Sequence, residues 1–220
     1  PMEKSGKELT NRSKVYPRMG KGSSVGLMWT ILSVAACAIV FYVNSAYSTG
    51  FLSNDGSQYL STARNLLAGN GIYTDIVLFD PHYDFGTIPV PQTIWPPGFP
   101  FLIGLSAQVF GDPQYAAFAL NLLFQVGTCA LFCFLLKAHG CSNRLSLMFS
   151  LLFLLFVQGW FYSLSISSEP TFVFLTLLCV TLLSIAYKSR NRRLLLLAAG
   201  TAAALAFLVR YAGVFLLFSA

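Results

Sequence analysis

Hydrophobic residues form long runs that polar residues interrupt only briefly. Four runs of about 20 residues cover about 25–47, 114–136, 145–164 and 170–187, and a fifth begins at Leu194 and continues toward the end of the chain. A helix needs about 20 apolar residues to cross a bilayer, and lipid accepts only helices or closed barrels because unpaired backbone groups are costly there. These runs are too long for barrel strands. The pattern therefore predicts an all-α, polytopic helical membrane protein with about five transmembrane helices.

Two shorter segments between the first two runs also predict helices. Residues 56–68 place apolar side chains on one helical face, at Tyr59, Ala63, Leu66 and Leu67. Their polar neighbours lie mostly elsewhere around the helix, at Gln58, Thr62, Arg64 and Asn65. Residues 98–110 are apolar but too short to span, so we expect a helix that lies at the outer interface or dips into it. The first outer loop, 48–112, is thus predicted to hold two short juxtamembrane helices joined by a proline-containing linker, 72–95.

The distribution of charge sets the predicted topology. The net charge is +6, but the basic residues lie in the N-terminal tail or just beyond apolar runs. This is the pattern of cytoplasmic helix ends and not of a nucleic-acid-binding surface, so we expect no nucleic-acid partner. Residues 1–24 are then a basic cytoplasmic tail, and 25–220 form the transmembrane domain. Of the 14 Lys and Arg residues, all but Arg64 and Arg210 fall on the cytoplasmic side.

The first apolar run is expected to remain as a membrane anchor. A basic region precedes it, as in a signal peptide, but its apolar part has about 20 residues where a signal has 7–15.

Acidic residues give separate information about the two faces of the membrane. Outside the tail, every one falls on the predicted outer side: Asp55, Asp75, Asp80, Asp84, Asp112 and Glu169. Any chemistry is therefore expected at the outer leaflet.

Three ionisable residues near the predicted helix ends are candidates for that chemistry. Asp55 is either an N-cap of the 56–68 helix or a reactive carboxylate at the outer mouth of the first membrane helix. Glu169, between two spans, either punctuates a helix start or is a second carboxylate that faces Asp55 across a cavity. Arg210 either reaches the outer headgroups or neutralises a lipid-linked phosphate, and we favour the second. Residues 80–84 contain Asp, His and Asp at alternating positions. These side chains could form a cation site, but we favour the interpretation that they are solvated residues of a loop.

The order of these motifs resembles the N-terminal part of the GT-C glycosyltransferases. After the first span come N-D-G-S-Q-Y-L-S-T-A-R-N-L-L-A-G-N-G, then P-P-G-F-P-F-L-I-G-L-S-A-Q-V-F-G, S-E-P and L-V-R-Y-A-G. Within that superfamily the chain is most similar to bacterial relatives of protein O-mannosyltransferases (glycosyltransferase family 39) and of the aminoarabinose transferase of lipid A. The resemblance covers about residues 25–213, and it lies in the order and spacing of the motifs more than in any one of them.

The resemblance implies a membrane enzyme that takes a sugar from a polyprenyl-phosphate carrier and transfers it at the outer face. The partners would be that donor, a glycan, lipid or protein acceptor, and membrane lipids. Asp55 and Glu169 match the family's two acidic positions and would be the catalytic residues, which in some members also bind a divalent metal ion. Substrate-binding roles would fall to a second group of residues: Arg210, Arg64, Tyr59 and Trp95.

The chemistry itself explains these residue types. A carboxylate orients and deprotonates the acceptor hydroxyl, while a cation stabilises the departing phosphate. Asp55 suits the first role, and Arg210 or Arg64 suits the second. Tyr59 and Trp95 are expected to stack on a sugar or to anchor at the headgroups, and we favour anchoring.

Two departures from the family pattern limit the expectation. Trp95 stands where the aminoarabinose transferases carry a basic residue, which argues against that substrate. The chain also has fewer spans than the family, so we expect it to be the N-terminal part of a longer protein. The expected location is a bacterial inner membrane, with the N-terminus cytoplasmic and the active site outside. The alternatives are a non-catalytic transporter or lipid-binding protein, and an assembly subunit in which Asp55 is only a cap.

Overall fold

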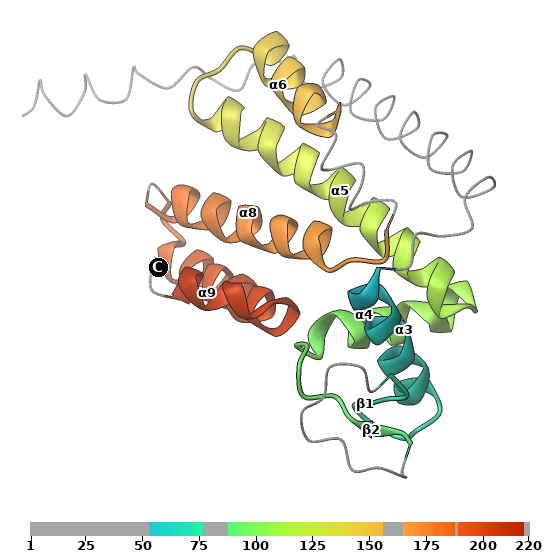
Figure 1. Ribbon diagram of the computed structural model, residues 1–220. Coiled ribbons are helices and arrows are strands. Elements are labelled where there is room, and N and C mark those ends of the chain that lie inside the picture. The colour runs from blue at the N-terminus through green and yellow to red at the C-terminus, as the bar shows by residue number, and fades with distance from the viewer. Residues whose placement is uncertain (1–52, 77–87, 156–164, 188, 218–220) are drawn as a thin grey trace, which may run out of the picture.

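The computed structural model describes residues 53–76, 88–155, 165–187 and 189–217, and these are mainly helical (Figure 1). The juxtamembrane part contains α3 (Asn54–Leu67), β1 (Tyr73–Thr74), β2 (Val90–Pro91) and α4 (Gly98–Phe110). The long helices are α5 (Pro113–Ala138), α6 (Asn143–Leu155), α8 (Glu169–Ala186) and α9 (Arg192–Val209). A 3-10 turn, η1 (Tyr211–Gly213), and α10 (Val214–Leu217) follow.

Three helices in the described part of the chain are long and apolar enough to cross a membrane: α5, α8 and α9. They occupy the runs predicted at 114–136, at 170–187 and from Leu194 onward. The predicted span 145–164 is described as far as the end of α6, and the predicted span 25–47 lies outside the described residues, as does the basic tail. The structure thus confirms a helical membrane protein, while the prediction of five spans extends beyond the residues that it describes.

Small residues allow α8 and α9 to pack closely. The second of two buried clusters joins Cys179 of α8 to three alanines of α9, all at most 3% exposed: Ala199, Ala202 and Ala203. Helices in lipid associate through such close packing because apolar side chains gain little by leaving the hydrocarbon. The two helices therefore run side by side (Figure 1).

The two short helices predicted between the first two apolar runs agree closely with the structure. α3 begins at its N-cap Ser53, whose Oγ accepts a hydrogen bond from the N–H of Gly56 at 3.0 Å, and it ends before Gly69, which has a positive φ of 81°. α4 has the predicted bounds and 13 residues. At 1.5 Å per residue it is about 20 Å long, too short for a hydrocarbon core of about 30 Å.

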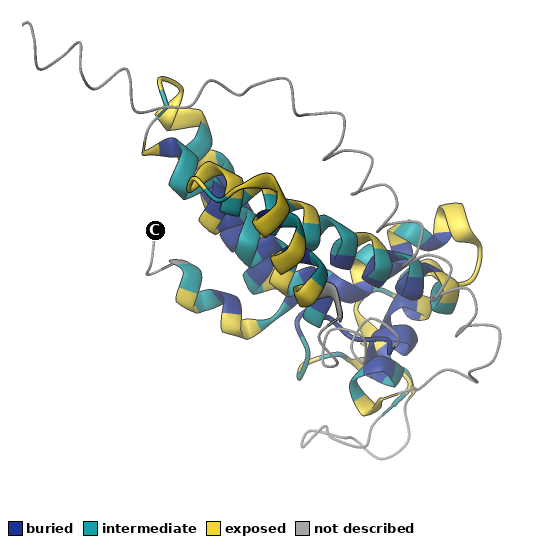
Figure 2. Ribbon diagram, turned by 90° about the horizontal axis from the view of Figure 1, so that it is seen from above, coloured by how far each residue is buried: buried dark blue, intermediate teal, exposed yellow. Residues whose placement is uncertain are grey.

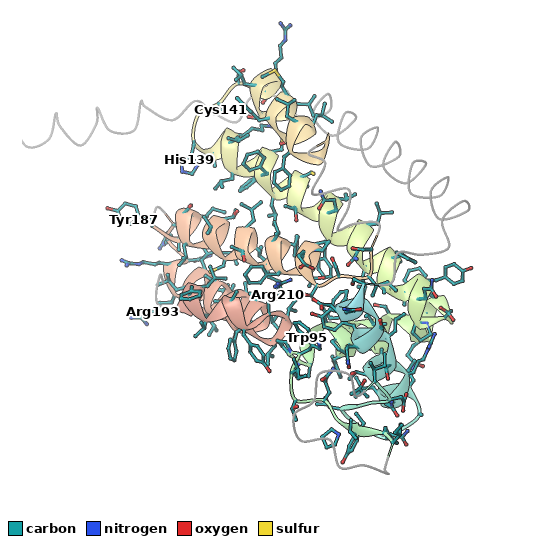
Figure 3. The ribbon with its side chains drawn as sticks, in the orientation of Figure 1. Trp95, His139, Cys141, Tyr187, Arg193 and Arg210 are labelled. Atoms are coloured by element: carbon teal, nitrogen blue, oxygen red, sulfur yellow. The ribbon has the colours of Figure 1, made fainter. Side chains whose placement is uncertain are left out.

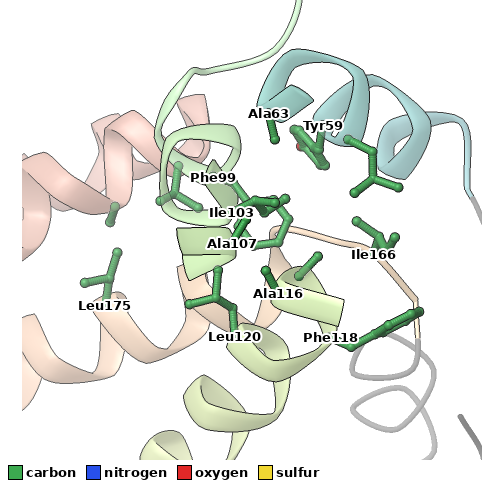
Figure 4. Packing of buried hydrophobic residues seen from close by; sticks show 14 residues of the cluster. Tyr59, Ala63, Phe99, Ile103, Ala107, Ala116, Phe118, Leu120, Ile166 and Leu175 are labelled. Atoms are coloured by element: carbon green, nitrogen blue, oxygen red, sulfur yellow. The ribbon is translucent and has the colours of Figure 1, made fainter. Parts of the chain in front are cut away.

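The main buried cluster lies where α3 and α4 meet the long helices (Figure 4). Tyr59 and Ala63 of α3 are 2% and 0% exposed, and they meet Phe99 and Ile103 of α4, both at 0%. The long helices carry many exposed and half-exposed residues (Figure 2). The best-buried part of the described chain is therefore the junction that holds α3 and α4 on the long helices.

The polar side of α3 is also buried, which the sequence pattern did not predict. Gln58, Thr62 and Asn65 are 2%, 0% and 5% exposed. Thr74 Oγ1 donates to Gln58 Oε1 at 2.9 Å, and Asn65 Nδ2 donates to Asp75 Oδ2 at 3.0 Å. These bonds attach the segment after α3 to the helix.

The segment predicted as a linker, 72–95, has more structure than expected in its described residues. Tyr73 and Thr74 pair antiparallel with Pro91 and Val90. The connection between α3 and α4 thus contains a short antiparallel pair, which the sequence pattern did not indicate. Residues 77–87, with the Asp-His-Asp candidate at 80–84, lie outside the described residues.

Candidate functional site

Three charged residues stand at helix ends that converge. Asp55 is in the first turn of α3, Glu169 is in the first turn of α8, and Arg210 caps the C-terminus of α9. Each charge suits its place, since helix N-termini favour carboxylates and C-termini favour cations. The fold therefore brings together residues from a stretch of more than 150 positions.

The start of α3 is docked on the segment that leads into α8. A Cβ on Gly56 would lie 2.7 Å from the carbonyl oxygen of Ile166, so only a glycine lets the backbones approach this closely. Asn121 of α5 holds the same segment from another side, through a 2.7 Å hydrogen bond from Nδ2 to the carbonyl oxygen of Ser165. Asp55 and Glu169 are thereby held in fixed relation.

The backbone around Arg210 is fixed in a similar way. Arg210 leaves α9 in an extended conformation, while its N–H still donates to the carbonyl of Ala206 at 2.9 Å. The N–H of Gly213 donates back to the carbonyl of Arg210 at 2.8 Å. The start of α4 meets the end of α9 so closely that a Cβ on Gly98 would lie 2.5 Å from the carbonyl oxygen of Leu208.

Arg210 and Glu169 form an ion pair through Nη1 and Oε1, and their side chains are 33% and 27% exposed. The same Nη1 donates to Ser168 Oγ over a long 3.4 Å, and Ser168 Oγ lies 3.1 Å from the hydroxyl of Tyr59. A chain of polar contacts therefore links α3, the N-terminus of α8 and the C-terminus of α9. Figure 3 labels Arg210 at this junction.

The surroundings of Asp55 raise the pKa of its carboxyl group. Burial raises the pKa of its carboxyl group, the nearby charge of Glu169 raises it further, and Arg210 opposes both. Burial also raises the pKa of Tyr59 to about 12, so its hydroxyl keeps its proton. A carboxyl group with a raised pKa is a better proton acceptor than an ordinary aspartate, which suits general-base catalysis.

Tyr59 and Trp95 lie beside this site, but they pack inward. Tyr59 is 2% exposed, and its ring meets Phe99 and Trp95 edge-on at centroid distances of 5.1 and 6.1 Å. Trp95 is half-buried against the same cluster, and its Nε1 is buried with no hydrogen-bond partner in the described part of the chain. In this conformation the ring of Tyr59 offers no face to a sugar or to the headgroups.

Arg64 is not brought to the other candidates. It is exposed in the last turn of α3, about 14 Å along the helix axis from Asp55 at 1.5 Å per residue. For a metal ion, the described residues contain no group of three potential His, Cys, Asp or Glu ligands, and Glu169 already faces Arg210. The metal-binding role of Asp55 and Glu169 therefore stays a prediction.

The sequence pattern did not indicate Ser168 or the packing glycines. Ser168 stands at the N-cap position of α8, yet its side chain makes no capping bond. Gly56, Gly98 and Gly213 would each place a Cβ against neighbouring backbone. The sequence did contain a signal for these three glycines, because each lies in one of the motifs on which the family resemblance rests. Gly56, for example, directly follows Asp55.

A family model for dolichyl-phosphate-mannose-protein mannosyltransferase matches residues 95–220, which include Gly98, Glu169 and Arg210. No curated protein and no solved structure matches the chain. The family match begins after α3, so the placement of Asp55 beside Glu169 is an observation of the structure alone.

Proposed function

Because the chain belongs to the dolichyl-phosphate-mannose-protein mannosyltransferase family, we propose that it transfers a sugar from a polyprenyl-phosphate-linked donor to an acceptor hydroxyl at the outer face of the membrane. The acceptor is a glycan, a lipid or a protein, and the family name makes mannose the first sugar to test. The observation that carries the proposal is the convergence of Asp55, Glu169 and Arg210 at the ends of helices. A partly exposed arginine and a partly exposed carboxylate are the two groups that this transfer needs.

Asp55 is the base in this mechanism. Its carboxylate accepts the proton of the acceptor hydroxyl as the hydroxyl oxygen attacks the anomeric carbon. The bond between that carbon and the phosphate oxygen breaks, and the polyprenyl phosphate leaves with the electron pair. A carboxylate positioned this way typically contributes about 10²–10⁴-fold to the rate.

Arg210 stabilises the leaving phosphate. Its Nη1 faces Glu169 and Ser168, and an arginine has five N–H groups in one plane. The edge formed by Nε and Nη2 carries the remaining N–H groups, and this edge can bind two phosphate oxygens at once. Negative charge that develops on the phosphate therefore meets a cation that Glu169 and Ser168 together hold in place.

The outer surface of α4 fits a site beside the lipid headgroups. Phe101, Leu105 and Val109 are 60%, 60% and 82% exposed, and their spacing places them on one face of the helix. A short helix with an exposed apolar face suits the membrane interface, where a polyprenyl chain would approach. An interfacial α4 supports a site at a membrane surface, and the location that we propose is the outer leaflet of a bacterial inner membrane.

The test of the proposed function compares two classes of donor. Membranes that contain the full chain are given mannose labelled on polyprenyl phosphate or on a nucleoside diphosphate, with membranes lacking the protein as control. We expect labelled product from the lipid-linked donor only, with one polyprenyl phosphate released per sugar transferred. Transfer from the nucleotide donor would contradict the proposed donor, and no transfer from either would favour the non-catalytic alternatives.

A further inference from the structure

Ser168 occupies an N-cap position without acting as a cap. An N-cap serine usually accepts a hydrogen bond from the backbone N–H two or three residues later. The Oγ of Ser168 makes no such bond, and the residue is 0% exposed. Its hydroxyl therefore has another role at the start of α8.

That role follows from its contacts with two other helices. Ser168 Oγ accepts from Nη1 of Arg210 at 3.4 Å and lies 3.1 Å from the hydroxyl of Tyr59, which is 2% exposed. A serine hydroxyl offers one donor and two acceptor positions, so it can satisfy both neighbours together. Tyr59 thereby fixes the hydroxyl of Ser168, and Ser168 fixes the Nη1 end of the guanidinium.

Two oxygens are needed to orient the guanidinium. The ion pair with Glu169 alone leaves the Arg210 side chain free to pivot about a single contact at Nη1. A second contact at the same nitrogen removes that freedom and directs the edge formed by Nε and Nη2. An arginine orders a phosphate only when its planar fork has a defined direction.

We infer that Ser168, held by Tyr59, is a positioning residue that orients Arg210 toward the phosphate of a lipid-linked substrate. The inference rests on the proposed function for the nature of that substrate. Ser168 and Tyr59 touch neither the sugar nor the acceptor in this role. Tyr59 thus contributes through its buried hydroxyl and not through an exposed ring.

The test measures binding of polyprenyl phosphate, the product that would leave Arg210, to the full chain in nanodiscs of neutral phospholipid. We expect Ser168→Ala to weaken binding about tenfold, as for the loss of a hydrogen bond to a charged group. Tyr59→Phe is expected to weaken it less, because the contact between Ser168 and Arg210 remains. In an Arg210→Lys background, Ser168→Ala is expected to have no further effect, because lysine has no fork to orient.

Thr171→Val is the matched control. Thr171 is also 0% exposed in the first turn of α8, but its hydroxyl has no hydrogen-bond partner in the described part of the chain. Removing that hydroxyl should leave binding unchanged. Wild-type binding by Ser168→Ala, or the same fold loss with arginine and with lysine at position 210, would overturn the positioning role.

Sugar transfer by the same preparations separates this inference from the proposed function. Binding that depends on Ser168 in a protein that transfers no sugar would contradict the proposed function and support the positioning role. If the protein transfers sugar but Ser168→Ala binds polyprenyl phosphate as tightly as the wild type, the proposed function is supported and the positioning role is contradicted.

Discussion

Asp55→Asn is expected to lower sugar transfer by at least about 100-fold, the lower limit for loss of a well-placed general base. Asparagine has nearly the same shape, but its amide cannot take a proton from the acceptor hydroxyl. The helix should survive, because Ser53 and not Asp55 is the N-cap of α3. The measurement is the initial rate of transfer from the polyprenyl-phosphate donor by the full chain in membranes.

Asp112→Asn is the control for that variant. Asp112 caps α5 by accepting hydrogen bonds from the N–H groups of Gln114 and Tyr115, and asparagine caps a helix about as well as aspartate. Its transfer rate should equal that of the wild type. Equal transfer by Asp55→Asn at equal expression would reduce Asp55 to a charge in the first turn of a helix.

Gly98→Ala is expected to reduce transfer by about 10- to 100-fold although glycine has no chemical role. The new Cβ would lie 2.5 Å from the carbonyl oxygen of Leu208 and 3.1 Å from the nitrogen of Val209, the residue before Arg210. Backbone atoms cannot move aside as a side chain tip can, so α4 and the end of α9 must separate. A displacement of about 1 Å at a catalytic group can cost about 100-fold in rate.

The matched control lies in the same helix. A Cβ on Gly104 would meet no atom closer than 3.9 Å, so Gly104→Ala should retain transfer. It should also stabilise the protein slightly, since alanine favours a helix over glycine by about 1 kcal/mol. Transfer rates and thermal unfolding in detergent would be measured for both variants. A Gly98→Ala protein as active as Gly104→Ala would show that the contact between α4 and α9 does not position Arg210.

The sequence predicted the helices well because their signals are local. The region of α3 followed from the spacing of its apolar residues, and the bounds of α4 followed from the short apolar run at 98–110. The membrane helices followed from run length, which responds to the thickness of the bilayer. These features need no knowledge of which segments touch.

The contacts between distant segments were not predictable to the same degree. The order of motifs suggested that Asp55, Glu169 and Arg210 act together, but no local pattern shows that Arg210 pairs with Glu169 through Nη1. Nor does local pattern distinguish Ser168 as a cap from Ser168 as a bridge. The burial of the polar side of α3 was not predicted for a related reason. Its hydrogen-bond partners lie in the segment after the helix, whose sequence pattern predicts only a linker.

The central claim is that three distant segments form one site in which the Asp55 carboxylate is the base. The most direct test is the pH dependence of kcat/KM for transfer by the wild type and by Glu169→Gln. Asp55 works deprotonated, so activity should fall as the pH drops through its pKa, which lies above the ordinary 3.8. Removing the negative charge of Glu169 lowers that pKa, so the acidic limb should move to lower pH, whereas Asp112→Asn should leave it in place. An acidic limb at the same pH in Glu169→Gln and the wild type, or one moved to higher pH, would contradict the claim that Asp55 and Glu169 share a site.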